Sequence, residues 1–390
     1  MWAAGLIAFV GFVSVALLTH WSGVRLGGVV VVPLLAVYTL VNAWALPLFA
    51  VSVLVAYAVG ALLEERTLVF GHPLVFLYAL AGAVVPMVAL ALLSLTSTPS
   101  IPFRELALFG SILPGITAYN VRALPAGRRW LDAQMSVGLF SLLLVLGALL
   151  VSPETASRFG TLTPRVLFAP GADIAELRDA TVSLVGSRPA IPRAVVLLPF
   201  AFGVGLVAYL RQRLGLHLGL VALPLVAVFT YYDLVVLALF LAVLAVTYGF
   251  ETALHRQTLV YGRVLLGAGL AVAVLVTVVG GAALPIQRGT SALFAGILAG
   301  FGAHNLHLTA RQNLSLHLST TAAVFALSLG VVVAVVPFVE ADPAWRQSRF
   351  ALAVAAGLLL TGAAVARAVL AQQRAHEDRL LSAVSGGDQP

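Results

Sequence analysis

The chain has 390 residues, of which 61% are hydrophobic and only 9% charged, and its mean hydropathy is +1.06. This composition excludes a soluble globular domain and predicts an integral membrane protein. The formal net charge is +7, and every basic residue is an arginine. Arginines beside membrane helices act mainly as topology signals, and attraction for anionic lipid or cargo is the alternative. No basic stripe interleaved with aromatic residues occurs, which argues against nucleic-acid binding.

Apolar runs near the length that a helix needs to cross a bilayer follow one another along the chain. The first has no basic residues before it, so we interpret it as a retained helix and not as a cleaved signal peptide. The predicted spans are 2–19, 26–42, 46–63, 73–95 and 131–152, then 194–210, 216–232, 236–254, 264–284 and 314–337, and last 349–370. The predicted fold class is therefore all-α, a polytopic membrane helical bundle.

The two sets of five spans are copies of one unit. Residues 28–71 align with residues 219–262 without a gap, at a constant offset of 191. Apolar composition alone does not match Pro, Gly, Thr and Asn at constant spacing, so we infer a tandem duplication with about six membrane segments in each copy. The predicted domains are membrane repeat 1 at 1–152, a polar linker at 153–193, membrane repeat 2 at 194–338, and an extra helix with a cytoplasmic tail at 339–390.

The polar linker is the only long hydrophilic stretch between spans. It contains a short amphipathic pattern at 172–182, with Pro and Gly on both sides, which suits a linker or a surface cap. The tail after Ala371 carries mixed charge, and we expect its end to be disordered.

A short glycine-bearing segment in each copy decides the topology. Segments 104–119 and 289–304 either cross the membrane as thin or broken helices, or enter it and return. If they cross, both copies run in the same direction, and most loop arginines fall on one side. By the positive-inside rule that side is cytoplasmic, which places the N-terminus outside and the C-terminus inside. If they return, the copies are inverted. We favour the crossing.

Glycine and proline recur at two kinds of position. Glycine lets backbones approach closely in a membrane, and proline interrupts a helical hydrogen-bond ladder, so these residues predict either packed kinks or breaks that line a polar path. The predicted breaks are Gly27, Gly28, Pro33, Gly71, Pro114, Gly115, Gly219, Pro224, Gly262 and Gly300.

Polar residues follow the short segments. Asn120 and Arg122 follow Pro114 and Gly115, and Asn305 follows Gly300. Exposed backbone dipoles at such a point could hold a carboxylate, while the alternative is a helix end capped by Asn with interfacial Arg anchors. Among the remaining ionisable residues, Glu64, Glu251 and His255 are interpreted as loop or interface residues.

Missing residue types exclude several kinds of chemistry. Without lysine there is no phosphate-binding loop of the GxxxxGK[ST] type, and without cysteine there is no thiolate metal site or cysteine nucleophile. The eight histidines show neither an HExxH motif nor zinc spacing. We therefore expect no cofactor, no metal and no catalytic residue in this chain alone, and a role as a subunit of a larger enzyme stays open.

At these motifs the sequence resembles the CapC/PgsC family, the small membrane component of poly-γ-glutamate capsule synthase. The resemblance rests on Arg25-Leu-Gly27-Gly28 through Pro33, on Leu259-Val-Tyr261-Gly262-Arg263, and on Pro114-Gly115-Ile-Thr-Ala118-Tyr-Asn120. It covers about residues 5–150 and again 200–337. The family member is one unit, whereas this chain has two units and an extra helix, and its loop lacks the double Arg.

The resemblance implies a non-catalytic membrane subunit in the synthesis and export of an anionic polymer. Its partner would be a cytoplasmic Mur-ligase-like ATP-dependent subunit, which performs the amide ligation. Arginine suits contact with carboxylates, so the residues expected to contact cargo or partner are Arg25, Arg66, Arg122, Arg263, Asn120 and Asn305. Two alternatives stay open: a secondary transporter for a small anionic solute, and a membrane scaffold without a path.

Overall fold

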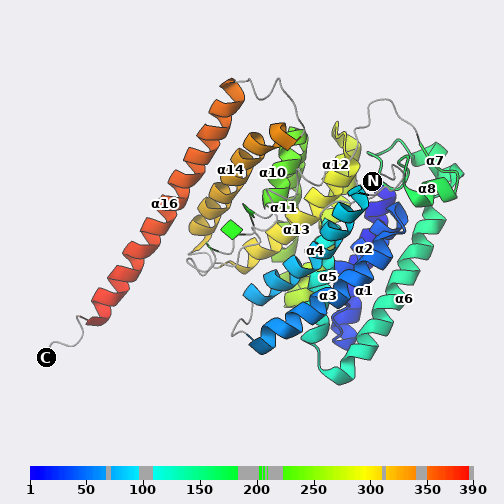
Figure 1. The fold of residues 1–390 in the computed structure, drawn as a ribbon, viewed down its shortest axis with the longest axis horizontal. Coiled ribbons are helices and arrows are strands. Elements are labelled where there is room, and N and C mark those ends of the chain that lie inside the picture. Colours follow the sequence, from blue (N-terminus) through cyan, green and yellow to red (C-terminus); the bar gives the residue numbers. More distant parts are fainter. Residues whose placement is uncertain are drawn as a thin grey trace. The chain divides into compact units, whose positions relative to one another are not determined.

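The structure is a computed structural model of the whole chain. It describes residues 1–66, 72–95, 109–182, 202–203, 205–206, 209, 223–309, 313–339 and 349–385. The regular secondary structure throughout these ranges is helical, as the composition predicts, and seven of the helices are long and apolar enough to cross a membrane. The chain is therefore a multi-pass membrane protein of the all-α class (Figure 1).

The chain divides into two compact units. Unit 1 comprises Met1–Arg193 and Val235–His304, and unit 2 comprises Ala194–Leu234 and Asn305–Pro390. These units divide the chain differently from the predicted repeats, because part of the second repeat packs with the first. The division at 152, 193 and 338 describes sequence copies, and it stays a prediction.

Unit 1 contains most of the described helices. They are α1 (Trp2–Ser22), α2 (Val31–Val41), α3 (Ala45–Arg66), α4 (His72–Leu95), α5 (Phe109–Arg122), α6 (Ala126–Leu150), α7 (Pro153–Phe159), α8 (Asp173–Leu177), α11 (Leu234–Thr258), α12 (Gly262–Ala283) and α13 (Gly289–Leu308), the last running into unit 2. The span predicted at 26–42 is too long: α2 has 11 residues, because the glycines before it form a turn.

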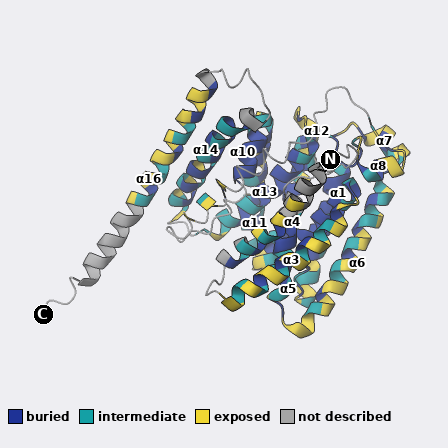
Figure 2. Cartoon of the chain, in the orientation of Figure 1, coloured by how far each residue is buried: buried dark blue, intermediate teal, exposed yellow. Residues whose placement is uncertain are grey.

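Helix α1 is more enclosed than its neighbour α6, as Figure 2 shows by its darker colour. Small residues let its neighbours come close. A Cβ at Gly5 would overlap Val278 of α12, a Cβ at Gly11 would meet Pro33 of α2, and a Cβ at Gly267 of α12 would meet Ala16. This is the small-residue packing expected of helices in lipid, where no hydrophobic effect drives them together.

One end of unit 1 is covered by residues 151–182, which follow α6, and we name it the cap end. The Met1 amine donates to the carbonyl of Pro164 at 2.5 Å, and the Trp2 indole donates to Phe159 at 2.9 Å. The amide of Ala43, just before α3, donates to Asp173 at 2.7 Å. The predicted amphipathic helix is present but shorter, as α8, and the segment lies beside the N-terminus and α6 (Figure 1). Of the two interpretations, a surface cap describes this part better than a linker.

The opposite end, the arginine end, has cations from five helices and from the turn after α1. It carries Arg25, Arg66, Arg122, Arg128, Arg129, Arg256 and Arg263. Exposed aromatic side chains mark both ends, with Trp21, Trp130 and Tyr261 at the arginine end and Trp44 at the cap end. Such rings are typical of membrane interfaces, so the bundle between them corresponds to the hydrocarbon core.

Contacts between the helices give their directions within unit 1. Helices α3 and α11, which occupy equivalent places in the predicted repeats, both run from the cap end to the arginine end. Helix α13 starts against the backbone of Pro164 at the cap end and passes Thr277 and Leu270 of α12 on its way to His304. Its 20 residues measure about 30 Å, the thickness of a bilayer core. Within unit 1, segment 289–304 runs from the cap end to the level of Glu251, and the crossing that we favoured stays a prediction.

Unit 2 contains α10 (Leu223–Tyr232), α14 (Leu314–Val339) and α16 (Arg349–Ser385). Leu223, Val324 and Val369 form its buried cluster. Gly330 of α14 faces Leu359 of α16, and Gly362 of α16 faces Leu327 of α14, so small residues set this helix contact as well. The predicted span at 194–210 and the first part of the predicted span at 216–232 lie largely outside the described residues, as do Gly71 and Gly219.

Candidate functional site

The turn between α1 and α2 brings irregular backbone into the bundle. Helix α1 ends at Gly23 in the left-handed conformation, and Leu26, Gly27 and Gly28 follow with φ values of 51°, 65° and 126°. Leu26 and both glycines are buried. Non-helical backbone inside a membrane bundle is tolerated only where protein groups satisfy its N–H and C=O groups.

Asp132 supplies that partner. Its carboxylate accepts three successive backbone N–H groups, from Arg25 at 2.6 Å, Leu26 at 2.7 Å and Gly27 at 3.3 Å. The side chain is buried and lies two turns into α6, about 10 Å below the start of that helix. Three convergent N–H groups form an anion-binding concavity, here occupied by an acid of the chain itself.

Asn120 joins the same turn to two helices. Its amide nitrogen donates to the carbonyl of Gly27 at 3.1 Å and to that of Ile116 at 2.9 Å, and its side-chain oxygen accepts from Arg263 at 3.1 Å. Asn120 therefore links α5, the turn and the first residues of α12. Arg25, two residues before Gly27 in the same turn, adds a second cation to this part of the arginine end.

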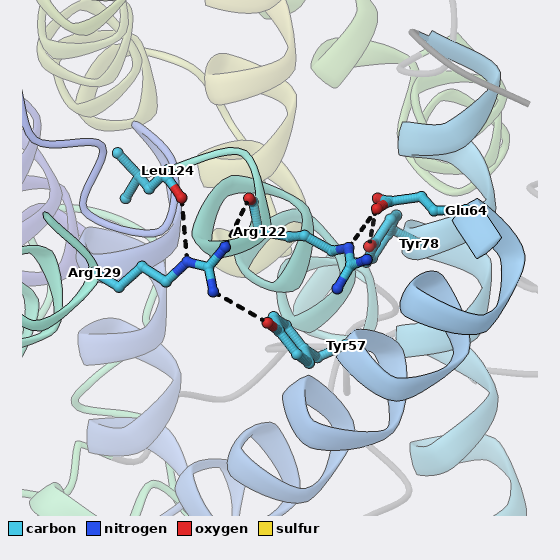
Figure 3. A network of polar contacts seen from close by, with 6 residues as sticks. All are labelled: Tyr57, Glu64, Tyr78, Arg122, Leu124 and Arg129. Carbon is cyan, nitrogen blue, oxygen red and sulfur yellow. Dashed lines mark hydrogen bonds and ion pairs between the residues drawn. The ribbon is translucent and has the colours of Figure 1, made fainter. Parts of the chain in front are cut away.

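A second cluster surrounds Arg122 at the same end, and Figure 3 shows it. Its guanidinium pairs with Glu64 of α3 and stands 5.7 Å from the centre of the Tyr57 ring. Glu64 in turn accepts from the Tyr78 hydroxyl at 3.0 Å.

Arg129 completes this cluster, and it binds backbone carbonyl groups instead of a carboxylate. It donates to the carbonyl of Leu124 at 3.1 Å, to that of Arg122 at 3.3 Å, and to the Tyr57 hydroxyl at 3.5 Å (Figure 3). The two guanidinium groups thus share Tyr57, while only Arg122 contacts a carboxylate.

The arginine end has more cations than the acids around it neutralise. Glu64 is bound by Arg122, and Asp132 is occupied by backbone N–H groups. Within the described residues, no salt bridge joins Arg25, Arg66, Arg128 or Arg256 to a carboxylate. Such an end attracts anions and can form charge-assisted hydrogen bonds to carboxylates.

The sequence-predicted contact residues are brought together only in part. Arg25, Arg122, Arg263 and Asn120 lie in the connected clusters just described. Arg66 is exposed at the last turn of α3. Asn305 follows His304 on α13 and belongs to unit 2, so it is not placed with the others.

The predicted breaks also divide into two kinds. Gly27 and Gly28 do form a non-helical turn, whereas α5 continues through Pro114 and Gly115, and α13 continues through Gly300. Those glycines allow close packing: a Cβ at Gly115 would overlap the backbone of Tyr78 and Ala79. Pro33 and Pro224 lie in the first turn of their helices, where a missing N–H costs little, and Gly262 is the left-handed residue that opens α12.

Sequence reasoning did not select Asp132, Tyr78 or Arg129 individually. Asp132 carried a usable signal, because it is the single acid in a long apolar span. An isolated intramembrane acid marks a site by default, since the membrane makes its charge costly. Its partners could not be identified, because they lie more than 100 positions away in the chain.

Residues 10–130 match a family model described as capsule biosynthesis CapC. This confirms the resemblance to the CapC/PgsC family of poly-γ-glutamate synthase over that segment, which includes Arg25, Glu64, Asn120 and Arg122. The match implies a membrane component of capsule biosynthesis. No curated protein and no solved structure matches the chain.

Proposed function

We propose that this chain is the non-catalytic membrane subunit of a complex that makes and exports an anionic polymer of the poly-γ-glutamate class. The arginine end is its cytoplasmic face. There it docks a Mur-ligase-like ATP-dependent subunit and receives the growing chain, whose carboxylates contact the free guanidinium groups.

One observation carries the proposal most directly. The segment that matches the capsule family contributes Arg25, Asn120 and Arg122 to one end of unit 1, and Arg263 joins them from α12. A polymer with one carboxylate per residue needs several weak cationic contacts, because a single tight site would hold it in place. Guanidinium groups on separate helices supply contacts of that kind.

The test replaces Arg25, Arg122 and Arg263 with Gln, one at a time, in a strain that carries the chain with its neighbouring genes. We expect each variant to lower cell-surface polymer several-fold, with Arg122→Gln most severe because it also leaves Glu64 unpaired. Surface polymer and intracellular polymer are both measured, together with the amount of the chain in the membrane.

The matched control is Arg158→Gln, which removes an exposed arginine from the cap end. The proposal predicts unchanged polymer in this variant. Unimpaired polymer in all three variants at the arginine end, with normal protein levels, would refute the proposed role of this face. Co-purification from mild detergent tests docking: recovery of an ATP-dependent ligase supports it, and recovery of the chain alone opposes it.

A second candidate is a secondary transporter for a small anionic solute. The buried ionisable pair Glu251–His304 favours it, because ion-coupled carriers place such groups inside the membrane. Uptake of radiolabelled glutamate into vesicles containing the purified chain separates the candidates. Saturable uptake without any partner supports the transporter.

A further inference from the structure

Unit 1 holds an ionisable pair away from the arginine clusters. Glu251 of α11 is fully buried, and its Oε2 lies 3.2 Å from Nδ1 of His304 on α13. The other carboxylate oxygen has no hydrogen-bond partner among the described residues. The hydroxyl of Thr247, one turn earlier on α11, is likewise buried without a partner in that part of the chain.

The pair lies inside a membrane-spanning helix. Glu251 is seven residues from the end of α11, about 10 Å in from the arginine end. A lone carboxylate at such depth costs several kcal/mol or more, so the pair is expected to keep at least one proton. That proton can reside on the imidazole, giving an ion pair, or on the carboxyl, giving two neutral groups.

Packing alone does not require an acid at this position. Under the offset of 191, Glu251 corresponds to Gly60 of α3, and Gly269 of α12 corresponds to Tyr78 of α4. A Cβ at Gly60 would overlap the Tyr78 ring, and a Cβ at Gly269 would overlap the Glu251 carboxylate. In the contact between α3 and α4, the glycine lies on α3 and the large residue, Tyr78, on α4. In the equivalent contact between α11 and α12, the large residue, Glu251, lies on α11 and the glycine on α12.

This exchange of large and small residues has a consequence for function. Because α3 and α4 make this contact without burying a carboxylate, an uncharged pair of residues is enough to pack the two helices. The cost of burying Glu251 then needs another reason, and an intramembrane acid with a histidine beside it is the usual composition of a proton relay.

We propose that Glu251 and His304 form an exchangeable proton-binding site inside the bundle, and that this site drives the membrane step of export. Uptake forms an O–H bond on Glu251 or an N–H bond on His304, and release to water breaks it. The site itself rests on the geometry of unit 1, while its link to export rests on the proposed function.

Few titratable residues flank the pair on its own two helices: Tyr248 and His255 on α11, and His307 on α13. Helix α12 presents Gly269 at this point, and α13 presents His304. The His255 Nδ1 lies 3.0 Å from the carbonyl of Val260. A pH response of Glu251 should therefore depend on His304 before any other residue.

Infrared difference spectroscopy of the purified chain in lipid nanodiscs tests the site without any cargo. We expect a pH-dependent C=O stretch of a protonated carboxyl that is absent in Glu251→Gln, and whose midpoint moves in His304→Gln. The control Glu65→Gln removes an exposed acid of α3 and should leave that band unchanged. A band that survives in Glu251→Gln overturns the proton site, and an unmoved midpoint in His304→Gln overturns the pairing.

A second variant removes the carboxylate while keeping the helix packing, so that loss of the band is not due to misfolding. The double substitution Glu251→Gly with Gly269→Tyr imitates the packing of Gly60 and Tyr78, and it should fold while also lacking the band. Surface polymer in this variant should fall several-fold. A normal amount of surface polymer in a variant that has lost the infrared band would overturn the coupling of the proton site to export. The test with the Arg→Gln variants would not be affected by that result. Loss of polymer in the arginine variants alone therefore separates the two proposals.

Discussion

At the scale of single residues, the arginine end is organised by one acid and two glycines. The Asp132 carboxylate holds three N–H groups of a turn that has left the helical conformation, and Asn120 holds one of its carbonyls. The turn can adopt this path only because Gly27 and Gly28 have no Cβ. The turn thereby places Arg25 at the same end of unit 1 as Arg263 and Arg122.

Substitution of Gly28 tests this account. Its φ of 126° is nearly restricted to glycine, and a Cβ there would lie 3.1 Å from the Asn120 amide nitrogen. We expect Gly28→Ala to cost about 1–3 kcal/mol and to lower the melting temperature in detergent. The control Gly138→Ala changes a helical glycine with open space around it and should be neutral or stabilising by up to about 1 kcal/mol. Equal melting temperatures for the two variants would contradict the strained turn.

At the scale of elements, several of the closest helix contacts are made at glycines. Gly115 of α5 lies against the backbone of α4 at Tyr78 and Gly82, which brings Asn120 and Arg122 to the same end as Glu64. The helix ends recur at the offset of 191 to within one residue: α2 ends at Val41 and α10 at Tyr232, while α3 ends at Arg66 and α11 at Thr258. The duplication itself stays a prediction.

The close packing of α4 against α5 predicts that a larger residue at position 115 lowers the stability of the protein. We expect Gly115→Ala to separate the two helices, because the atoms in its way belong to backbone and cannot rotate aside. The cost should be about 1–3 kcal/mol, seen as a lower melting temperature, with a weakened Arg122–Glu64 contact and less surface polymer. Gly249→Ala on α11, which meets open space, is the matched control. A stable, fully active Gly115→Ala variant would show that the close approach is dispensable.

At the scale of the whole molecule, the open question is which way the protein faces in the membrane. The arginine end and the cap end lie on opposite ends of unit 1, and the positive-inside rule assigns the arginine end to the cytoplasm. The absence of natural cysteine makes this orientation directly measurable.

Two single-cysteine variants test the orientation with a membrane-impermeant maleimide. Leu177 is 78% exposed at the cap end, and Gly127 is exposed at the arginine end with nothing near it. We expect Leu177→Cys to react in intact cells and Gly127→Cys to react only after permeabilisation. The reverse pattern would place the arginine end outside and remove the basis for docking a cytoplasmic ligase.

The sequence by itself determined the class of molecule, the positions of its spans, the concentration of arginine on one side, and the resemblance to the capsule family. Hydropathy, charge bias and repeat spacing are local properties that add along the chain, so they can be evaluated without contacts. Only the tertiary structure decided that Asp132 binds the turn at Gly27, that Arg263 reaches Asn120, and that Glu251 meets His304. These partners are separated by 105, 143 and 53 positions, and a contact at such a distance depends on how whole helices pack. The glycines were visible in the sequence as possible breaks, but their use for close approach depends on what lies opposite each of them.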